Sequence, residues 1–216
     1  MGHQLYKLRL CSVAVLAMCL TLLSGSAYAE VYVAGQGGYT LPNDLTSIEG
    51  TGILSGVSVS DLKLHDSVVY GGKVGYYLPR VNWLGIETEL FNTSPHVKQQ
   101  PITVLGVTVP AAPGFSLNVL TWAINVLVRY PGKQFQPYAG VGLGVFFAEA
   151  KFQGQSDKDV APGLNALAGL RFFATDRIAL FAEYKYNRAT FELPEAIGLK
   201  ADYSANHFVG GVSFHF

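Results

Sequence analysis

Charged residues are scarce in this sequence, and neither sign of charge is in excess. They make up 14% of the 216 residues, with 15 Lys and Arg against 15 Asp and Glu, whereas soluble domains carry roughly 25%. The mean hydropathy is positive, at +0.27, which excludes an intrinsically disordered chain. The lack of a basic excess gives no support to a nucleic-acid-binding protein. We therefore expect a membrane protein or a β-rich domain, with no nucleic-acid partner.

Cysteine is almost absent, and its two copies lie close to the N-terminus. Cys11 and Cys19 fall in an apolar run of about 13 residues, which is shorter than the roughly 17–25 residues of a transmembrane helix. Basic residues precede this run and the small-x-small sequence Ala27-Tyr28-Ala29 follows it, a pattern typical of a cleaved secretory signal peptide. The sequence thus predicts a signal peptide over 1–29 and a cysteine-free domain over 30–216, without disulfides or a thiolate metal site.

Long hydrophobic runs are absent after this N-terminal segment, which excludes a helical membrane domain. A membrane β-barrel needs only strands of about 9–11 residues, in which lipid-facing and lumen-facing positions alternate. Eight segments alternate in this way, with apolar residues on one face and polar residues or glycine on the other. They are residues 31–39, 68–78, 83–91, 120–130, 138–148, 165–173, 178–187 and 207–216. The sequence therefore predicts an all-β fold, an eight-stranded antiparallel up-and-down transmembrane β-barrel.

The connections between these segments alternate in length. Short turns follow the second, fourth and sixth segments, whereas the connections over 40–67, 92–119, 149–164 and 188–206 are longer and polar. Bacterial barrels have short periplasmic turns and longer outer loops, so we expect both termini on the periplasmic side. Aromatic residues gather beside the short turns, where a membrane-interface girdle belongs. They are Tyr76, Tyr77, Trp83, Tyr130, Tyr138, Phe172 and Phe173. A soluble barrel such as a lipocalin shares the alternation, but it leaves this clustering unexplained.

Several stretches of the chain are similar to a known family. The signal peptide, the eight alternating segments and a final strand ending in Phe216 resemble the small OmpA-like and OmpX-like outer-membrane barrels. The most similar stretches are QPYAGVGLG at 136–144, GLRFFATD at 169–176, FAEYKY at 181–186 and VGGVSFHF at 209–216. We expect no peptidoglycan-binding domain after Phe216.

This resemblance implies a location in the cell outer membrane, in contact with outer-membrane lipid and lipopolysaccharide. It also implies that the barrel-assembly machinery reads the last strand during biogenesis. The residues of this C-terminal assembly signal are Phe208, Val212, Phe214 and Phe216. We expect the barrel to be a monomer.

Charged residues occupy the lumen face of the predicted strands. The interior of an eight-stranded barrel is just wide enough for side chains to fill, and a buried charge without a partner is strongly unfavourable. We therefore expect these charges to pair and to close the lumen as a plug; a narrow, gated ion path is the alternative. The lumen charge network consists of Lys73, Glu87, Glu89, Arg129, Arg171, Glu183 and Lys185.

Residues with catalytic potential lie close to the expected outer rim. Ser204 and His207, with Asp202 or Glu195, could form a hydrolase triad of the kind that a lipid A-modifying barrel enzyme needs. The His-x-Ser-Asn motif of the lipid A deacylase family is absent, and the histidines, which include His65 and His96, lack metal-site spacing.

We therefore predict a structural or surface-interaction role, with no enzymatic activity, no cofactor and no metal. A low-conductance porin-like channel is the second reading, and a lipid A-modifying enzyme is the third. A surface ligand would bind the outer loops, where residues 102–109 alternate apolar and polar residues and could form a hairpin above the membrane.

Overall fold

The computed structural model describes residues 30–43, 46–50, 65–95, 100–104, 107–112, 116–152, 155–193 and 199–216. The predicted signal peptide over 1–29 lies outside these residues. Within them, no helix is long and apolar enough to cross a membrane.

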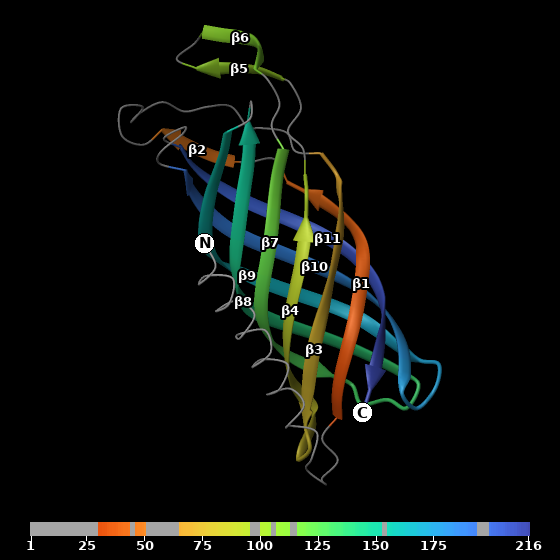
Figure 1. Cartoon of the computed structure of the whole chain (residues 1–216). Coiled ribbons are helices and arrows are strands. Elements are labelled where there is room, and N and C mark those ends of the chain that lie inside the picture. The colour runs from red at the N-terminus through yellow and green to blue at the C-terminus, as the bar shows by residue number, and fades with distance from the viewer. Residues whose placement is uncertain are drawn as a thin grey trace, which may run out of the picture.

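Eight long strands form a closed antiparallel barrel (Figure 1). Each strand pairs with the next along the chain, and the first and last strands pair from Tyr32↔His215 to Pro42↔Ala205, which closes the sheet. The barrel strands are β1 (Glu30–Pro42), β3 (Ser67–Leu78), β4 (Val81–Thr93), β7 (Ser116–Arg129), β8 (Phe135–Phe152), β9 (Gln155–Phe173), β10 (Ile178–Leu193) and β11 (Leu199–His215). The predicted fold class is confirmed. Six of the eight predicted segments fall within these strands, and the segments 120–130 and 207–216 extend one residue beyond β7 and β11.

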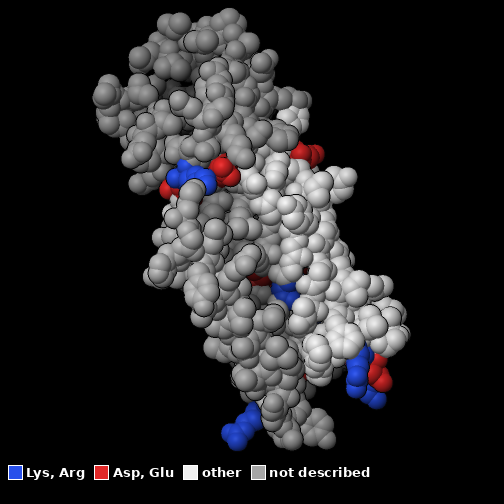
Figure 2. Space-filling model, in the orientation of Figure 1, with Lys and Arg blue, Asp and Glu red and all other residues white. Residues whose placement is uncertain are grey.

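The alternation of the sequence is the alternation of the barrel wall. On β7, Trp122 and Ile124 are 49% and 51% exposed on the outside. The residues that alternate with them, Thr121, Ala123 and Asn125, are buried inside. Successive side chains of a strand point to opposite faces, so every second residue of the strand lies on the outer surface, and these residues are apolar. On the face drawn in Figure 2, charged side chains gather toward the two ends, and charged atoms at mid-height appear only in a hollow of the wall.

Three turns of a few residues join β3 to β4, β7 to β8 and β9 to β10; we call this end of the barrel the short-turn end. Its aromatic girdle is only partly as expected. Tyr130 and Trp83 are exposed on the outside, but Tyr77 and Tyr138 are 1% and 4% exposed and lie in the lumen. Their positions in the alternation place them on the lumen face, and this outweighs their closeness to the turns.

The opposite end differs from the expected long loops. The stretches 149–164 and 188–206 were expected to be loops, but β8 runs to Phe152 and β9 starts at Gln155, and β10 and β11 likewise continue to Leu193 and from Leu199. Outside a membrane the outer face of a strand meets water instead of lipid, so the hydrophobic alternation fades while the backbone pairing continues. The buried residues between these extensions form one apolar cluster. It contains Leu117, Val119, Phe146, Ala148, Ala161, Ala189, Phe191, Tyr203 and Ala205.

The strand extensions separate between β9 and β10. Their pairing ends at Gly163↔Ala189, next to Pro162, which has no N–H to donate. The N–H of Val160 is bound by its own neighbour, because it donates to Asp159 Oδ1 at 2.8 Å. Proline and local capping are common at free strand edges, where they discourage unwanted pairing.

Three short strands complete the described structure. β2 (Thr46–Gly50) pairs with the far end of β11. β5 (Gln100–Val104) and β6 (Val107–Ala112) form a separate two-stranded sheet beyond the barrel (Figure 1). This hairpin corresponds to the one expected over 102–109.

Candidate functional site: the lumen charge network

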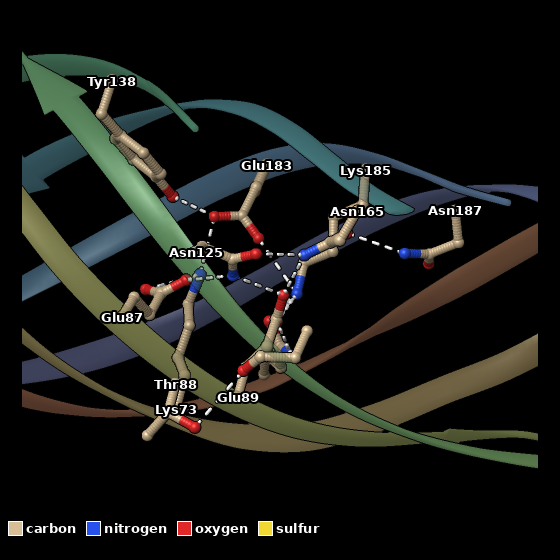
Figure 3. A network of polar contacts seen from close by, with 12 residues as sticks. Lys73, Glu87, Thr88, Glu89, Asn125, Tyr138, Asn165, Glu183, Lys185 and Asn187 are labelled. Carbon is tan, nitrogen blue, oxygen red and sulfur yellow. Dashed lines mark hydrogen bonds and ion pairs between the residues drawn. The ribbon is translucent and has the colours of Figure 1, made fainter. Parts of the chain in front are cut away.

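Five of the seven predicted lumen charges meet at mid-height in the barrel (Figure 3). Lys73 Nζ lies 2.6 Å from Glu183 Oε2 and 3.4 Å from Glu87 Oε2. Lys185 Nζ pairs with Glu89 and lies 3.2 Å from Glu183 Oε1. All five side chains are at most 1% exposed. Because β4 and β10 lie opposite each other in the strand order, the pair of Lys185 with Glu89 joins opposite walls of the lumen. The pair of Lys73 with Glu183 joins β3 to β10.

Period two explains why these charges share the lumen. Glu87 and Glu89 are two residues apart on β4, as Glu183 and Lys185 are on β10, so each pair projects from one face of its strand. The pairs between strands then depend on the register of the barrel, which brings β3, β4 and β10 to the same height here.

Uncharged polar side chains add hydrogen bonds to Glu89 and Lys185. Asn125 and Asn165 donate to Glu89 Oε1 at 3.0 and 2.7 Å, and Lys185 also donates to Gln36 Oε1 at 3.0 Å. The sequence interpretation did not single out these residues. Their signal was a polar amide on the lumen face at the height of the charges.

Two tyrosines extend the network toward the short-turn end. The hydroxyl of Tyr32 donates to Glu87. The hydroxyl of Tyr138 donates to Glu183 Oε2 at 2.8 Å, as Figure 3 shows. Neither was singled out for the network from the sequence. Tyr138 was assigned to the membrane girdle, and Tyr32 carries no charge that would have marked it.

Arg129 does not join the central cluster. Its Nη2 lies 2.5 Å from Glu30 Oε2, and its Nη1 donates to Gln136 Oε1 at 3.0 Å. His215 Nδ1 lies 2.7 Å from Glu30 Oε1. Glu30, Gln136 and His215 also line a cavity of about 680 Å³ at this end. This second polar group therefore lies at the short-turn mouth of the lumen.

Arg171 stands between the two groups and joins neither by hydrogen bonds. It is 1% exposed, and none of its three guanidinium nitrogens has a hydrogen-bond partner among the described residues. Instead it lies over the rings of Tyr32 and Tyr138, with its Cζ 4.3 and 5.1 Å from their centroids.

The possible catalytic residues do not come together. Ser204 accepts a hydrogen bond from Asn43 Nδ2 at 2.8 Å, whereas His207 is buried in the lumen with Nδ1 2.8 Å from Thr40 Oγ1. An odd spacing of three residues places the two side chains on opposite faces of β11, and Asp202 binds Arg188 and Thr190. Ser204, His207 and Asp202 therefore do not form the hydrolase triad that the sequence allowed. Glu195 and His96 lie outside the described residues.

No group of three or more potential metal ligands occurs in the part of the chain that the structure describes. The predicted C-terminal signal residues lie on the outer face of β11, each at least 40% exposed. They are Phe208, Val212, Phe214 and Phe216.

Comparison with known proteins places this geometry in context. Residues 12–216 match the model of the family described as outer membrane protein beta-barrel domain. No curated protein matches the chain.

Solved structures share the fold at low sequence identity. Neisserial surface protein A (NspA) has a TM-score of 0.57 at 16% identity, over 86% of this chain and 97% of that one. OprG from Pseudomonas aeruginosa has a TM-score of 0.55 at 15% identity, over 89% and 98%. The outer membrane protease OmpT from Escherichia coli has a TM-score of 0.52 at 9% identity, over 90% and 99%. Since one of these is named as a protease, the shared fold is compatible with more than one kind of function.

Proposed function

The chain belongs to the outer membrane protein β-barrel domain family and lies in the lipid of the outer membrane, and from this we propose a non-catalytic barrel with a plugged lumen and a structural or surface-interaction role. The low-conductance channel is the competing proposal. The two differ in whether the lumen offers a continuous aqueous path.

One observation carries the plug proposal. Glu183 on β10 pairs with both Lys73 and Lys185, and these lysines hold Glu87 and Glu89 on the opposite wall. Each charge thus has a partner of opposite sign, which a buried charge requires. The apolar cluster that includes Phe146 and Tyr203 covers the network on its far side.

Access of a thiol reagent to the lumen tests this proposal. Ala123 faces the lumen beside Glu89 and is 1% exposed, and residues 30–216 contain no cysteine. In the refolded barrel, A123C should resist a small charged thiol reagent, whereas T175C in an exposed short turn should react within minutes. Equally rapid labelling of A123C would refute the plug and support the channel.

Support for a surface role comes from the far end of the barrel. The β5–β6 hairpin pairs with no barrel strand among the described residues, and isolated hairpins are marginally stable in water. Their free edges suit strand addition by a partner. Replacing 100–112 by a Gly-Ser linker should leave refolding intact and reduce aggregation and surface adhesion of cells that display the protein. Unchanged adhesion would remove the hairpin from this role.

The absence of catalysis is also part of the proposal. It is supported by the separation of Ser204 from His207 on opposite faces of β11. Mass spectrometry of lipid A from cells with the wild-type protein, S204A or no protein should give identical spectra. A modification that depends on the protein would contradict a purely structural or binding role.

The biogenesis of the chain follows from the same reading. We propose that residues 1–29 are removed as a signal peptide, that the barrel-assembly machinery reads β11, and that the barrel is monomeric. N-terminal sequencing of the protein from outer membranes should begin at Glu30, and F216A should reduce the assembled fraction.

A further inference from the structure

Arg171 is the one lumen charge that the ion pairs described above leave unexplained. We propose that Arg171 is a positioning residue of the plug, which acts through Tyr32 and Tyr138 to hold their hydroxyl groups on Glu87 and Glu183. This inference rests on the proposed plug and names a further residue that keeps it closed.

The charges of the lumen balance only when Arg171 is included. The central cluster contains three carboxylates, Glu87, Glu89 and Glu183, but only two ammonium groups. The pair of Arg129 with Glu30 at the short-turn mouth is already balanced. Arg171 is therefore the cation that offsets the third carboxylate, although it touches none of the three.

The two tyrosines bridge the gap between this cation and the cluster. Arg171 Cζ lies 4.3 Å from the Tyr32 ring centroid and 5.1 Å from that of Tyr138. The far end of each ring donates its hydroxyl to a glutamate, Tyr32 to Glu87 and Tyr138 to Glu183. A cation over an aromatic face is attracted by the ring electrons. The positive charge also favours negative charge on the hydroxyl oxygen, and this makes the hydroxyl a better hydrogen-bond donor to a carboxylate.

Two glycines leave the space in which the rings lie. Gly75 is the cross-strand partner of Tyr32, and Gly169 is the cross-strand partner of Tyr138. A Cβ at Gly75 would lie 2.3 Å from the Tyr32 ring, and one at Gly169 would lie 2.7 Å from the Tyr138 ring. Both rings therefore lie across a strand position without a side chain, which keeps them close to the wall and leaves space for Arg171 between them.

A third tyrosine supplies an internal control. Tyr77 also lies near Arg171, with its ring centroid 5.9 Å from Cζ, and Arg129 stacks on it at 3.6 Å. Its hydroxyl, however, has no hydrogen-bond partner among the described side chains. Y77F should therefore leave the network unchanged, whereas Y32F and Y138F each remove one of the two donors.

The test combines a spectroscopic signal with a functional one. Tyrosine labelled with carbon-13 at Cζ reports the hydrogen bond of each hydroxyl by NMR, and Y32F and Y138F assign the two signals. In R171Q we expect both signals to shift toward those of weakly bonded tyrosine, and we expect discrete channel openings to appear in planar bilayers, where the wild type is silent. R171K retains the positive charge, so it should restore both readouts by at least half. Y77F should match the wild type in both.

The outcomes separate this inference from the plug itself. If R171Q leaves both signals and the openings unchanged, or R171K restores neither, Arg171 is only a packing residue and the inference fails. If K73M opens the channel while R171Q does not, the plug stands without Arg171; if K73M also leaves the barrel silent, the proposed plug has failed first. Should R171Q not refold, R171K and Y138F are combined instead. The inference then predicts non-additive shifts of the Tyr32 signal, and additive shifts overturn it.

Discussion

Lys73 and Glu183 are 110 residues apart in the chain, yet their side-chain atoms meet at 2.6 Å in the middle of the barrel. The contact exists only when β3 and β10 have both taken their places in the closed sheet. The ion pair therefore reports the register of the whole barrel.

Removing Lys73 alone should be more harmful than removing it together with the charge of Glu87, its second partner. K73M leaves Glu87 and Glu183 short of a cation and should lower the free energy of unfolding by about 3–5 kcal/mol. In K73M/E87Q the charge balance is restored, and at least half of the loss should be recovered. Urea titration followed by the heat-modifiable gel shift measures both. The control is K133M, an exposed lysine of the turn after β7, and a cost for K133M equal to that of K73M would argue against the network.

The outer wall should resist charge only where lipid covers it. Ile124 is 51% exposed at mid-height of β7, and Val160 is 55% exposed on the extension of β9. I124R should therefore cost about 2–4 kcal/mol, and V160R about 0–1 kcal/mol. Unfolding in lipid vesicles provides the comparison. Equal costs for the two variants would contradict the position of the membrane.

The buried hydroxyl of Tyr203 has no hydrogen-bond partner among the described residues. Its ring packs in the apolar cluster at the end of the barrel opposite the short turns, 5.8 Å from the ring of Phe191. An unsatisfied buried hydroxyl costs about 1–3 kcal/mol, so Y203F should be as stable as the wild type or more stable. Y138F removes a donor to Glu183 and should instead destabilise the barrel. A large loss in Y203F would reveal a partner for the hydroxyl.

Glycines on the two faces of the wall should differ in their tolerance of alanine. A Cβ at Gly75 would overlap the Tyr32 ring, whereas one at Gly35, on the outer face, meets nothing within 4 Å. We expect G75A to cost about 1–3 kcal/mol through overpacking. G35A should be neutral or gain up to about 1 kcal/mol, because alanine restricts the unfolded chain. Thermal unfolding of the two variants side by side would show whether this order is reversed.

The strands could be predicted from the sequence because the membrane imposes a strict alternation on them. Residues such as Trp122 and Asn125 show their faces by period alone. The extensions of β8 to β11 were missed, because a strand that leaves the membrane keeps its backbone pairing but loses the apolar face that reveals it. Length and polarity are then the same as those of a loop.

The candidate site was less accessible to sequence reasoning. The alternation indicates the face on which a charge such as Arg171 lies, but the shear of the barrel decides which charges share a height. Arg129 and Arg171 therefore lie apart from the lysines. The roles of Tyr32 and Tyr138 depend on cross-strand contacts with Gly75 and Gly169, which no local pattern contains.

Single-channel recording of the refolded barrel in planar bilayers tests the closed lumen most directly. The wild-type protein and K133M should insert, give the heat-modifiable gel shift and remain electrically silent, whereas K73M should produce discrete openings. Steady openings of the wild type would contradict the plug and establish the channel in its place.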